Sequence, residues 1–172
     1  MNGFMIKNLP DRACLEQMAA RYPEMDPGST EVHLHFLRLG AKVGGRIADY
    51  LSKHALSSGR LSILMMLNAC PEEARTPGEL ADRCGVTAAT MSRLVEGLIK
   101  EGHLERVPDP ENRRVSPVRM TAAGRAHLEQ LLPGYFLAVA DIFSPLSSVE
   151  RQDFLTLLNK LQNHLNETEK LS

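Results

Sequence analysis

The segment from residue 76 to residue 121 constrains the fold most, because its cap and turn residues divide it into two helices and a hairpin. Thr76 is a favourable N-cap, Pro77 is a favourable first helical residue, and Glu79 completes a capping box. Gly85 supplies the left-handed backbone that ends this short helix, and Thr87 caps a second one. A short helix, a turn containing glycine and a longer helix are typical of the helix-turn-helix motif.

The second helix of this motif, which Gly102 ends, has one apolar face and one small, polar face. Small side chains permit close approach to a duplex, hydroxyls reach phosphates or bases, and arginine binds guanine through two hydrogen bonds. The same residue types are common on ordinary exposed helices, so the helix alone leaves both interpretations open. The apolar residues that we expect to pack inward are Met91, Leu94, Val95, Leu98 and Ile99. The predicted DNA contacts are Thr87, Ala88, Ala89, Thr90, Ser92 and Arg93.

A predicted β-hairpin follows directly, with strands at His103–Val107 and Val115–Met120. Pro117 cannot donate a backbone hydrogen bond, so we expect the second strand to lie at an edge. By itself an arginine pair in the connecting loop indicates only a solvated turn, but beside a helix-turn-helix it is typical of a wing that contacts DNA. The expected inward residues are Leu104, Val118 and Met120. The predicted DNA contacts of the wing are Asn112, Arg113 and Arg114.

This segment resembles the winged-helix domain of the MarR (multiple antibiotic resistance regulator) family in three stretches. They are GHLER at Gly102–Arg106, DPENRR at Asp109–Arg114 and MTAAG at Met120–Gly124, and the resemblance extends upstream to Leu56 and Ser57. It implies a mainly α fold with a small β-hairpin wing, a winged helix-turn-helix flanked by N- and C-terminal dimerisation helices. The family's wing aspartate is Asn112 here, which replaces an ion pair to a neighbouring arginine by a neutral hydrogen bond.

Apolar stripes at helical spacing predict further helices on both sides of this domain. They are expected at Glu31–His54, at Ser57–Ala69, and from Thr121 to Phe143, where Pro133 predicts a kink. A capping box from Ser147 to Glu150 starts a last helix. The stripe of the first helix is Val32, Phe36, Leu39, Val43, Ile47 and Leu51, and that of the last is Phe154, Leu157, Leu158, Leu161 and Leu165. The inward residues expected at Ser57–Ala69 are Leu61, Leu64, Met65 and Leu67.

The chain is therefore expected to contain an N-terminal extension (1–30), a dimerisation helix (31–56), a winged helix-turn-helix domain (57–121) and C-terminal dimerisation helices (122–172). Within the extension, Ala13–Tyr22 predicts a short helix and Pro23–Ser29 a linker. A two-fold homodimer matches a palindromic operator and places its recognition helices in major grooves about 34 Å apart. The alternative is that the outer helices cover a monomeric core.

The resemblance also implies a small anionic or aromatic effector, bound between the dimerisation helices and the winged helix. Imidazole and guanidinium groups can bind a carboxylate and tyrosine or methionine a ring, although these residues are equally typical of a helix core or interface. Cys14, near two arginines, is the candidate for an alternative redox signal. The cysteine spacing and the pair His33 and His35, two residues apart, predict no metal site. The candidate effector contacts are His33, His35, Arg38, Tyr50, Met66 and Tyr135.

Composition narrows the classes of function. The 172 residues, 43% of them hydrophobic, contain neither an apolar run long enough for a membrane helix nor a signal-peptide pattern, so we expect a globular cytoplasmic protein. No phosphate-binding loop, nucleophile elbow or zinc-protease motif occurs, so we expect neither an enzyme nor a cofactor. The net charge is −1, and residues 60–120 hold nine basic and nine acidic side chains.

Two hypotheses follow. The first is a sequence-specific regulator, a ligand-responsive repressor that binds a palindromic operator as a homodimer. The near-neutral charge of residues 60–120 keeps a second open, a winged helix that binds another protein and has no operator of its own.

Overall fold

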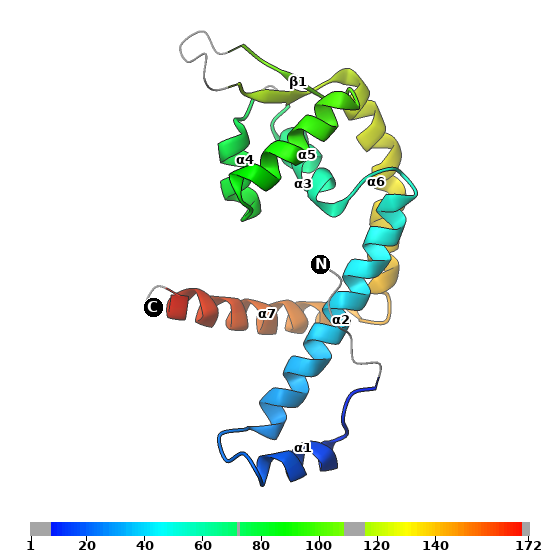
Figure 1. The fold of residues 1–172 in the computed structure, drawn as a ribbon. Coiled ribbons are helices and arrows are strands. Elements are labelled where there is room, and N and C mark those ends of the chain that lie inside the picture. Colours follow the sequence, from blue (N-terminus) through cyan, green and yellow to red (C-terminus); the bar gives the residue numbers. More distant parts are fainter. Residues whose placement is uncertain (1–7, 72, 109–115, 170–172) are drawn as a thin grey trace. The chain divides into compact units, whose positions relative to one another are not determined.

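The computed structural model describes residues 8–71, 73–108 and 116–169 (Figure 1). In these ranges, helices and a two-stranded antiparallel sheet confirm the mainly α fold with a small hairpin. The chain separates into two compact units, residues 1–131 and 132–172. The elements are α1 (Arg12–Ala19), α2 (Pro27–Ser52), α3 (Ser58–Ala69), α4 (Pro77–Cys84), α5 (Ala88–Lys100), β1 (Leu104–Arg106), β2 (Val118–Met120), α6 (Ala122–Ile142) and α7 (Ser148–Glu169).

The first unit begins with α1 and α2, which an arginine and a leucine connect. Arg12 on α1 binds Glu31 on α2, with 3.1 Å between Nη1 and Oε2, and it also binds Glu16 one turn along its own helix. Leu15 is buried, whereas most of α1 is exposed. The buried Leu15 and the ion pair between Arg12 and Glu31 thus hold α1 in place, and a helix this short is not stable in isolation.

The long helix α2 begins earlier than the sequence pattern indicated. Its N-cap is Asp26, whose carboxylate accepts a hydrogen bond of 2.6 Å from the Ser29 N–H, and Pro27 is its first residue. The linker predicted at Pro23–Ser29 is therefore wrong in its second half. An aspartate followed by a proline is a helix start signal, and it outweighed the turn-like composition of the segment.

The core of the first unit lies among α3, α4, α5 and the hairpin, with the end of α2 and the first half of α6. On α3 the outcome differs from the expectation, because Ile63 is buried and Met65 is only half-buried. This helix is apolar on most of its circumference, so its pattern does not single out one inward face. The largest fully buried side chains are Leu15, Leu51, Ile63, Leu64, Leu67, Leu80, Met91, Leu98, Leu104, Leu128, Leu131 and Val95.

The hairpin has shorter strands than predicted, and its second strand is not an open edge. Strand β1 pairs with β2 in antiparallel register, Leu104 opposite Met120. On its other side β2 forms an isolated bridge, in which Val118 and Arg75 exchange two backbone hydrogen bonds of 2.8 and 3.0 Å. The edge position expected from Pro117 is therefore wrong at the next residue, because the segment before α4 covers that edge. Leu104, Val118 and Met120 are buried, as predicted.

The second unit contains the end of α6 and the whole of α7. Helix α6 is continuous from Ala122 to Ile142, and the boundary between the units falls two residues before Pro133. The capping box of α7 is confirmed: the Ser147 N–H donates to Glu150 at 2.8 Å, and the Glu150 N–H donates to Ser147 Oγ at 3.2 Å. These hydrogen bonds favour the carboxylate and lower the pKa of Glu150.

Apolar side chains of both units remain exposed. On α2 the first part of the stripe is open to solvent, including Val32 at 63% and Phe36 at 52% exposure. On α7 the corresponding residues are Leu157, Leu161 and Leu165, of which Leu165 is 60% exposed. Neither stripe is covered by its own unit, which is unusual for a monomer.

Candidate nucleic-acid interface

The first helix of the helix-turn-helix, α4, starts with the predicted capping box. The Thr76 N–H donates to Glu79 Oε2 at 2.7 Å, and the Glu79 N–H donates to Thr76 Oγ1 at 3.2 Å. The hydrogen bonds from the Thr76 backbone and hydroxyl stabilise the carboxylate and lower the pKa of Glu79. The N-terminal end of α4 is thus held by reciprocal bonds between two residues.

The turn between α4 and α5 has the backbone that the sequence predicted. Gly85 adopts the left-handed conformation, with φ of 61°, and Val86 N–H donates to the Ala81 carbonyl at 3.1 Å. Thr87 then caps α5, because its Oγ1 accepts a hydrogen bond of 3.2 Å from the Thr90 N–H. This turn fixes the start of α5, whose N-terminal half is exposed to solvent.

All six residues predicted to contact DNA from α5 lie on its surface, in its cap and first two turns. Thr87, Ala88, Ala89, Ser92 and Arg93 are exposed, and Thr90 is half-buried. The hydroxyls of Thr87 and Thr90 are 3.0 Å apart and hydrogen-bonded to each other, so they form one joined polar group rather than two independent ones. Their contact with DNA stays a prediction.

The other predicted DNA contacts, Asn112, Arg113 and Arg114, lie outside the described residues. The base of the hairpin that carries them is described. Val107 N–H donates to the Pro117 carbonyl at 2.8 Å, and the Thr121 hydroxyl donates to the Gly102 carbonyl at 2.6 Å. The bond from Thr121 closes the hairpin at the end next to α5, and the bond from Val107 closes it at the opposite end of the strands.

Several of the nine basic and nine acidic residues in the range 60–120 are paired with one another. Among the described residues, four arginines in this range bind glutamates. Arg83 and Arg93 take part in none of the ion pairs of the described part of the chain. Each pair neutralises one basic and one acidic group, so the charge balance stays even, and any attraction for phosphates comes from cations such as Arg83 and Arg93. The four pairs are Arg60 with Glu101, Arg75 with Glu73, Arg106 with Glu96, and Arg119 with Glu105.

The sequence interpretation missed the contact between α3 and the end of α5. Arg60 Nη1 lies 2.7 and 3.0 Å from the two carboxylate oxygens of Glu101. The two residues are 41 positions apart, so no local rule connects them. The available signal was Gly97, a glycine inside a helix, which often marks a close approach.

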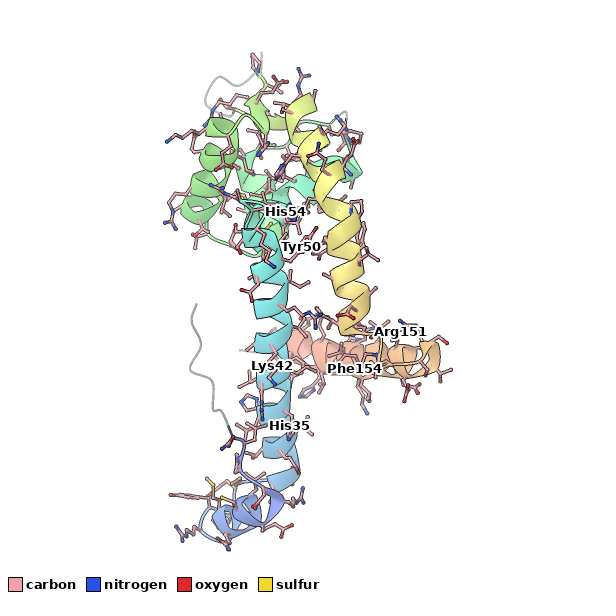
Figure 2. The ribbon with its side chains drawn as sticks, turned by 90° about the vertical axis from the view of Figure 1, so that its right-hand side faces the viewer. His35, Lys42, Tyr50, His54, Arg151 and Phe154 are labelled. Atoms are coloured by element: carbon pink, nitrogen blue, oxygen red, sulfur yellow. The ribbon has the colours of Figure 1, made fainter. Side chains whose placement is uncertain are left out.

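The predicted effector contacts do not form one site within the protomer. His33, His35 and Tyr50 lie on α2, and Figure 2 shows His35 and Tyr50 well separated along it. The rise of a helix places His33 and Tyr50 about 25 Å apart, which exceeds the size of a small ligand. The Tyr50 hydroxyl already donates a hydrogen bond of 2.9 Å to the Leu131 carbonyl. Of the rest, Arg38 is on α2, Met66 on α3, and Tyr135 on the part of α6 in the second unit.

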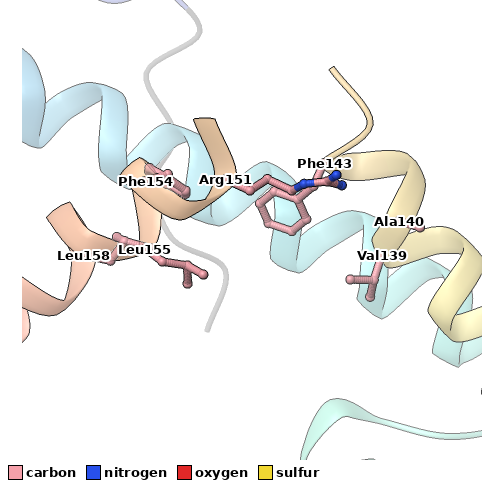
Figure 3. A pocket seen from close by; sticks show the side chains of 7 residues that line it. All are labelled: Val139, Ala140, Phe143, Arg151, Phe154, Leu155 and Leu158. Atoms are coloured by element: carbon pink, nitrogen blue, oxygen red, sulfur yellow. The ribbon is translucent and has the colours of Figure 1, made fainter. Parts of the chain in front are cut away.

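A pocket of about 340 Å³ lies in the second unit, between the end of α6 and the start of α7 (Figure 3). Its walls are apolar except for the guanidinium of Arg151. Tyr135 does not line it, although both belong to this unit. The lining residues are Val139, Ala140, Phe143, Arg151, Phe154, Leu155 and Leu158.

The cysteines and histidines form no metal site in the described ranges. All three cysteines are free thiols; Cys14 is exposed, and Cys70 and Cys84 are half-buried. No helix among the described residues combines the length and the apolar character needed to cross a bilayer. A redox role of Cys14 stays a prediction.

Comparisons with known proteins agree with this geometry. The model of the MarR family matches residues 51–115. The HTH-type transcriptional repressor YetL of Bacillus subtilis (strain 168) is 32% identical over 160 residues, which are 93% of this chain and 96% of that protein.

Two solved structures share the fold. A MarR mutant from E. coli, crystallised with operator DNA, has a TM-score of 0.65 and 23% identity, covering 84% of this chain and 96% of that one. The MarR family protein Rv2887 of Mycobacterium tuberculosis, in complex with DNA, has a TM-score of 0.59 and 25% identity. The match covers 73% of this chain and 93% of that one. With its helix-turn-helix and hairpin in place, and with a relative similar along nearly its whole length, this chain belongs to the MarR family of DNA-binding transcriptional regulators, which are not enzymes.

Proposed function

We propose that this regulator is a cytoplasmic repressor that binds a palindromic operator as a homodimer and leaves it when a small effector binds. The exposed N-terminal half of α5 is the observation that carries DNA recognition. Its small side chains surround Arg93, which no described acidic group neutralises. A helix of this kind fits the major groove, where an arginine can distinguish guanine from other bases.

The apolar stripes of α2 and α7 support the dimer. Side chains such as Phe36 and Leu165 are more than half exposed, and burying them against a second copy removes apolar surface from water. Two copies related by a two-fold axis present two recognition helices to two half-sites. Repression is proposed by analogy with YetL, which is described as a transcriptional repressor.

Four of the nine acidic residues between positions 60 and 120 are engaged in ion pairs. Each pair also neutralises one arginine, so the even charge balance stands and the alternative of a winged helix that binds only proteins stays open. Binding-site selection with random duplexes distinguishes the two. A regulator with its own operator enriches a palindrome, of about 16–20 base pairs with flanks, and a protein-binding module enriches nothing.

Binding-site selection together with binding titrations at several salt concentrations tests the predicted contacts separately. Arg113→Ala with Arg114→Ala weakens binding to every sequence and lowers the salt slope by roughly one per arginine removed, because phosphate contacts carry no sequence information. Arg93→Ala or Thr90→Ala changes which sequences are preferred. Unchanged affinity and salt dependence in the double variant would exclude the wing assignment, with Arg12→Ala, outside the winged helix, as control.

The effector is proposed to bind the released state better than the DNA-bound state, since only such a difference can dissociate the complex. A thermal-shift screen of aromatic acids and antimicrobial compounds identifies ligands of the folded protein. Each hit is then added to the operator complex in a gel-shift assay. A compound that stabilises the protein and leaves the complex intact is not the effector, and a screen in which every hit behaves so contradicts effector release by these classes.

A further inference from the structure

The residue that ends the recognition helix carries an unfavourable charge. Glu101 is the C-cap of α5, where the carbonyl groups of the last turn give the helix a partial negative charge. A carboxylate at this end is disfavoured unless a cation compensates it. Arg60 of α3 supplies that cation, because one of its nitrogens, Nη1, donates to both carboxylate oxygens, at 2.7 and 3.0 Å.

The path of Arg60 to Glu101 depends on a glycine. A Cβ built on Gly97 would lie 2.5 Å from Arg60 Nη2 and 3.3 Å from its Cζ, so the guanidinium lies directly on the surface of α5 at this position. Glycine is disfavoured relative to alanine inside a helix, and an alanine here would require the Arg60 guanidinium to shift. The start of α3 also lies close to α5, since a Cβ on Gly59 would lie 3.2 Å from Leu94 Cδ1.

A second ion pair joins the same half of α5 to another element. Glu96 binds Arg106 of β1, so the exposed acidic residues of α5 bind arginines from two different elements. Both pairs are in the C-terminal half of the helix. The predicted DNA contacts occupy the N-terminal half, which has no ion pair to the described residues. A tilt of about 10° at Gly97 displaces Thr87, about 15 Å away along the helix, by about 2.5 Å, which is enough to break a hydrogen bond to a base.

We propose that Arg60, acting through Glu101 across Gly97, is a positioning residue that sets the angle at which α5 enters the major groove. Arg60 itself does not contact DNA in this proposal. It rests on the proposed function, because the angle matters only if α5 recognises an operator.

The test compares variants on an operator that the wild-type protein has first selected from random duplexes. Glu101→Gln keeps the shape of the side chain and removes its charge. Gly97→Ala displaces the Arg60 guanidinium without removing any charge. The double variant Arg60→Glu with Glu101→Arg restores an ion pair of opposite direction. Arg12→Ala, which removes an exposed arginine that binds two glutamates outside the winged helix, is the matched control.

For each variant, affinity is measured at several salt concentrations on the selected operator, on operators with half-sites moved by single base pairs, and on random duplex. Glu101→Gln and Gly97→Ala are expected to lower the ratio of specific to non-specific affinity about tenfold, similar to one mismatched base pair. In both variants the dependence of affinity on half-site spacing is flattened or shifted. The non-specific affinity and its salt slope are unchanged. The charge-exchanged double variant recovers the wild-type specificity ratio and spacing dependence. The Arg12→Ala control keeps both.

Three results overturn the proposal. If both single variants lose thermal stability but keep the wild-type spacing profile and specificity ratio, the contact is merely structural. If specific and non-specific affinity fall together with the salt slope, Arg60 or Glu101 acts through charge on DNA rather than through position. If the wild-type protein enriches no sequence, the proposed function itself fails, and this outcome is recognised before any variant is made.

Discussion

The imidazole rings of His103 and His127 stack, with centroids 4.6 Å apart and an angle of 19° between their planes. His103 lies between α5 and β1, and His127 lies on α6. His103 Nδ1 and His127 Nε2 are buried and have no hydrogen-bond partner in the described structure. Burial lowers the pKa of His127, and the nearby His103 and His54 lower it further, whereas Glu101 opposes the shift. The junction between the hairpin and α6 is therefore built around an uncharged imidazole.

This pair predicts a loss of stability in mild acid. The pKa of His127 is lower in the folded protein, so below about pH 6.5 the unfolded chain binds a proton that the folded chain resists. The stabilising contribution is complete above this pH and is lost as the pH falls through the lowered pKa. The urea midpoint of unfolding should therefore fall between pH 7.5 and pH 5. His127→Gln should reduce the slope of this midpoint against pH. His164→Gln, at an exposed position on α7, is the control. Equal slopes in wild type and His127→Gln would contradict the assignment.

Gly124 should tolerate no larger residue. A Cβ at this position would collide with the backbone carbonyl oxygen of His103 and lie 3.0 Å from its Cα. Backbone atoms cannot rotate away as a side chain can, so we expect Gly124→Ala to cost about 1–3 kcal/mol of unfolding free energy in denaturant titrations. Gly45→Ala is the opposite control, because nothing lies within 4 Å of the added methyl group, and it should gain about 0.5–1 kcal/mol. An unchanged unfolding free energy in Gly124→Ala would mean that α6 can shift away from the hairpin.

The capping box of α4 should make a measurable contribution to stability. Thr76→Ala removes the acceptor for the Glu79 N–H, and we expect a loss of about 1 kcal/mol. Thr76→Ser keeps the hydroxyl and serves as control. Because the lowered pKa of Glu79 depends on the same residue, part of this difference should disappear when the unfolding free energy is measured at a pH below the carboxylate range. A difference independent of pH would assign the whole effect to the bond from the Glu79 N–H and none to the carboxylate.

The exposed leucines of α7 should determine the oligomeric state. Leu161→Lys with Leu165→Lys places two charges on the stripe, and light scattering should then give a mass near the 19.1 kDa of one chain. Asn159→Lys with Asn163→Lys adds the same charge to exposed positions on the opposite side of the helix and should leave the dimer intact. Dissociation of both variants, or of neither, would remove α7 from the proposed interface.

The features that the sequence predicted well depend on residues close together in the chain. Thr76, Gly85 and Thr87 act through bonds to residues three or four positions away, so composition and spacing reveal them. The inward face of the hairpin also follows from simple alternation. The predicted DNA contacts on α5 are correctly placed at its surface, but their role requires an experiment.

The features that the sequence did not predict require segments that meet only in the folded chain. Arg60 and Glu101, Arg75 and Val118, and His103 and His127 are 24 to 43 positions apart along the chain and interact through tertiary packing. The predicted effector contacts depend on residue type alone, and those on α2 are separated by the length of that helix. The charge count likewise does not record which charges are paired, because it is a sum over residues.

The bonds at the base of the hairpin have a consequence for how such a protein can change. Val107 with Pro117, Val118 with Arg75, and Thr121 with Gly102 together secure both strands, and none of these bonds involves a residue between 109 and 115. A substitution between 109 and 115 therefore removes no donor or acceptor of these bonds. The strands and the segment before α4 can keep them while the sequence of that range varies, in a natural lineage or by design.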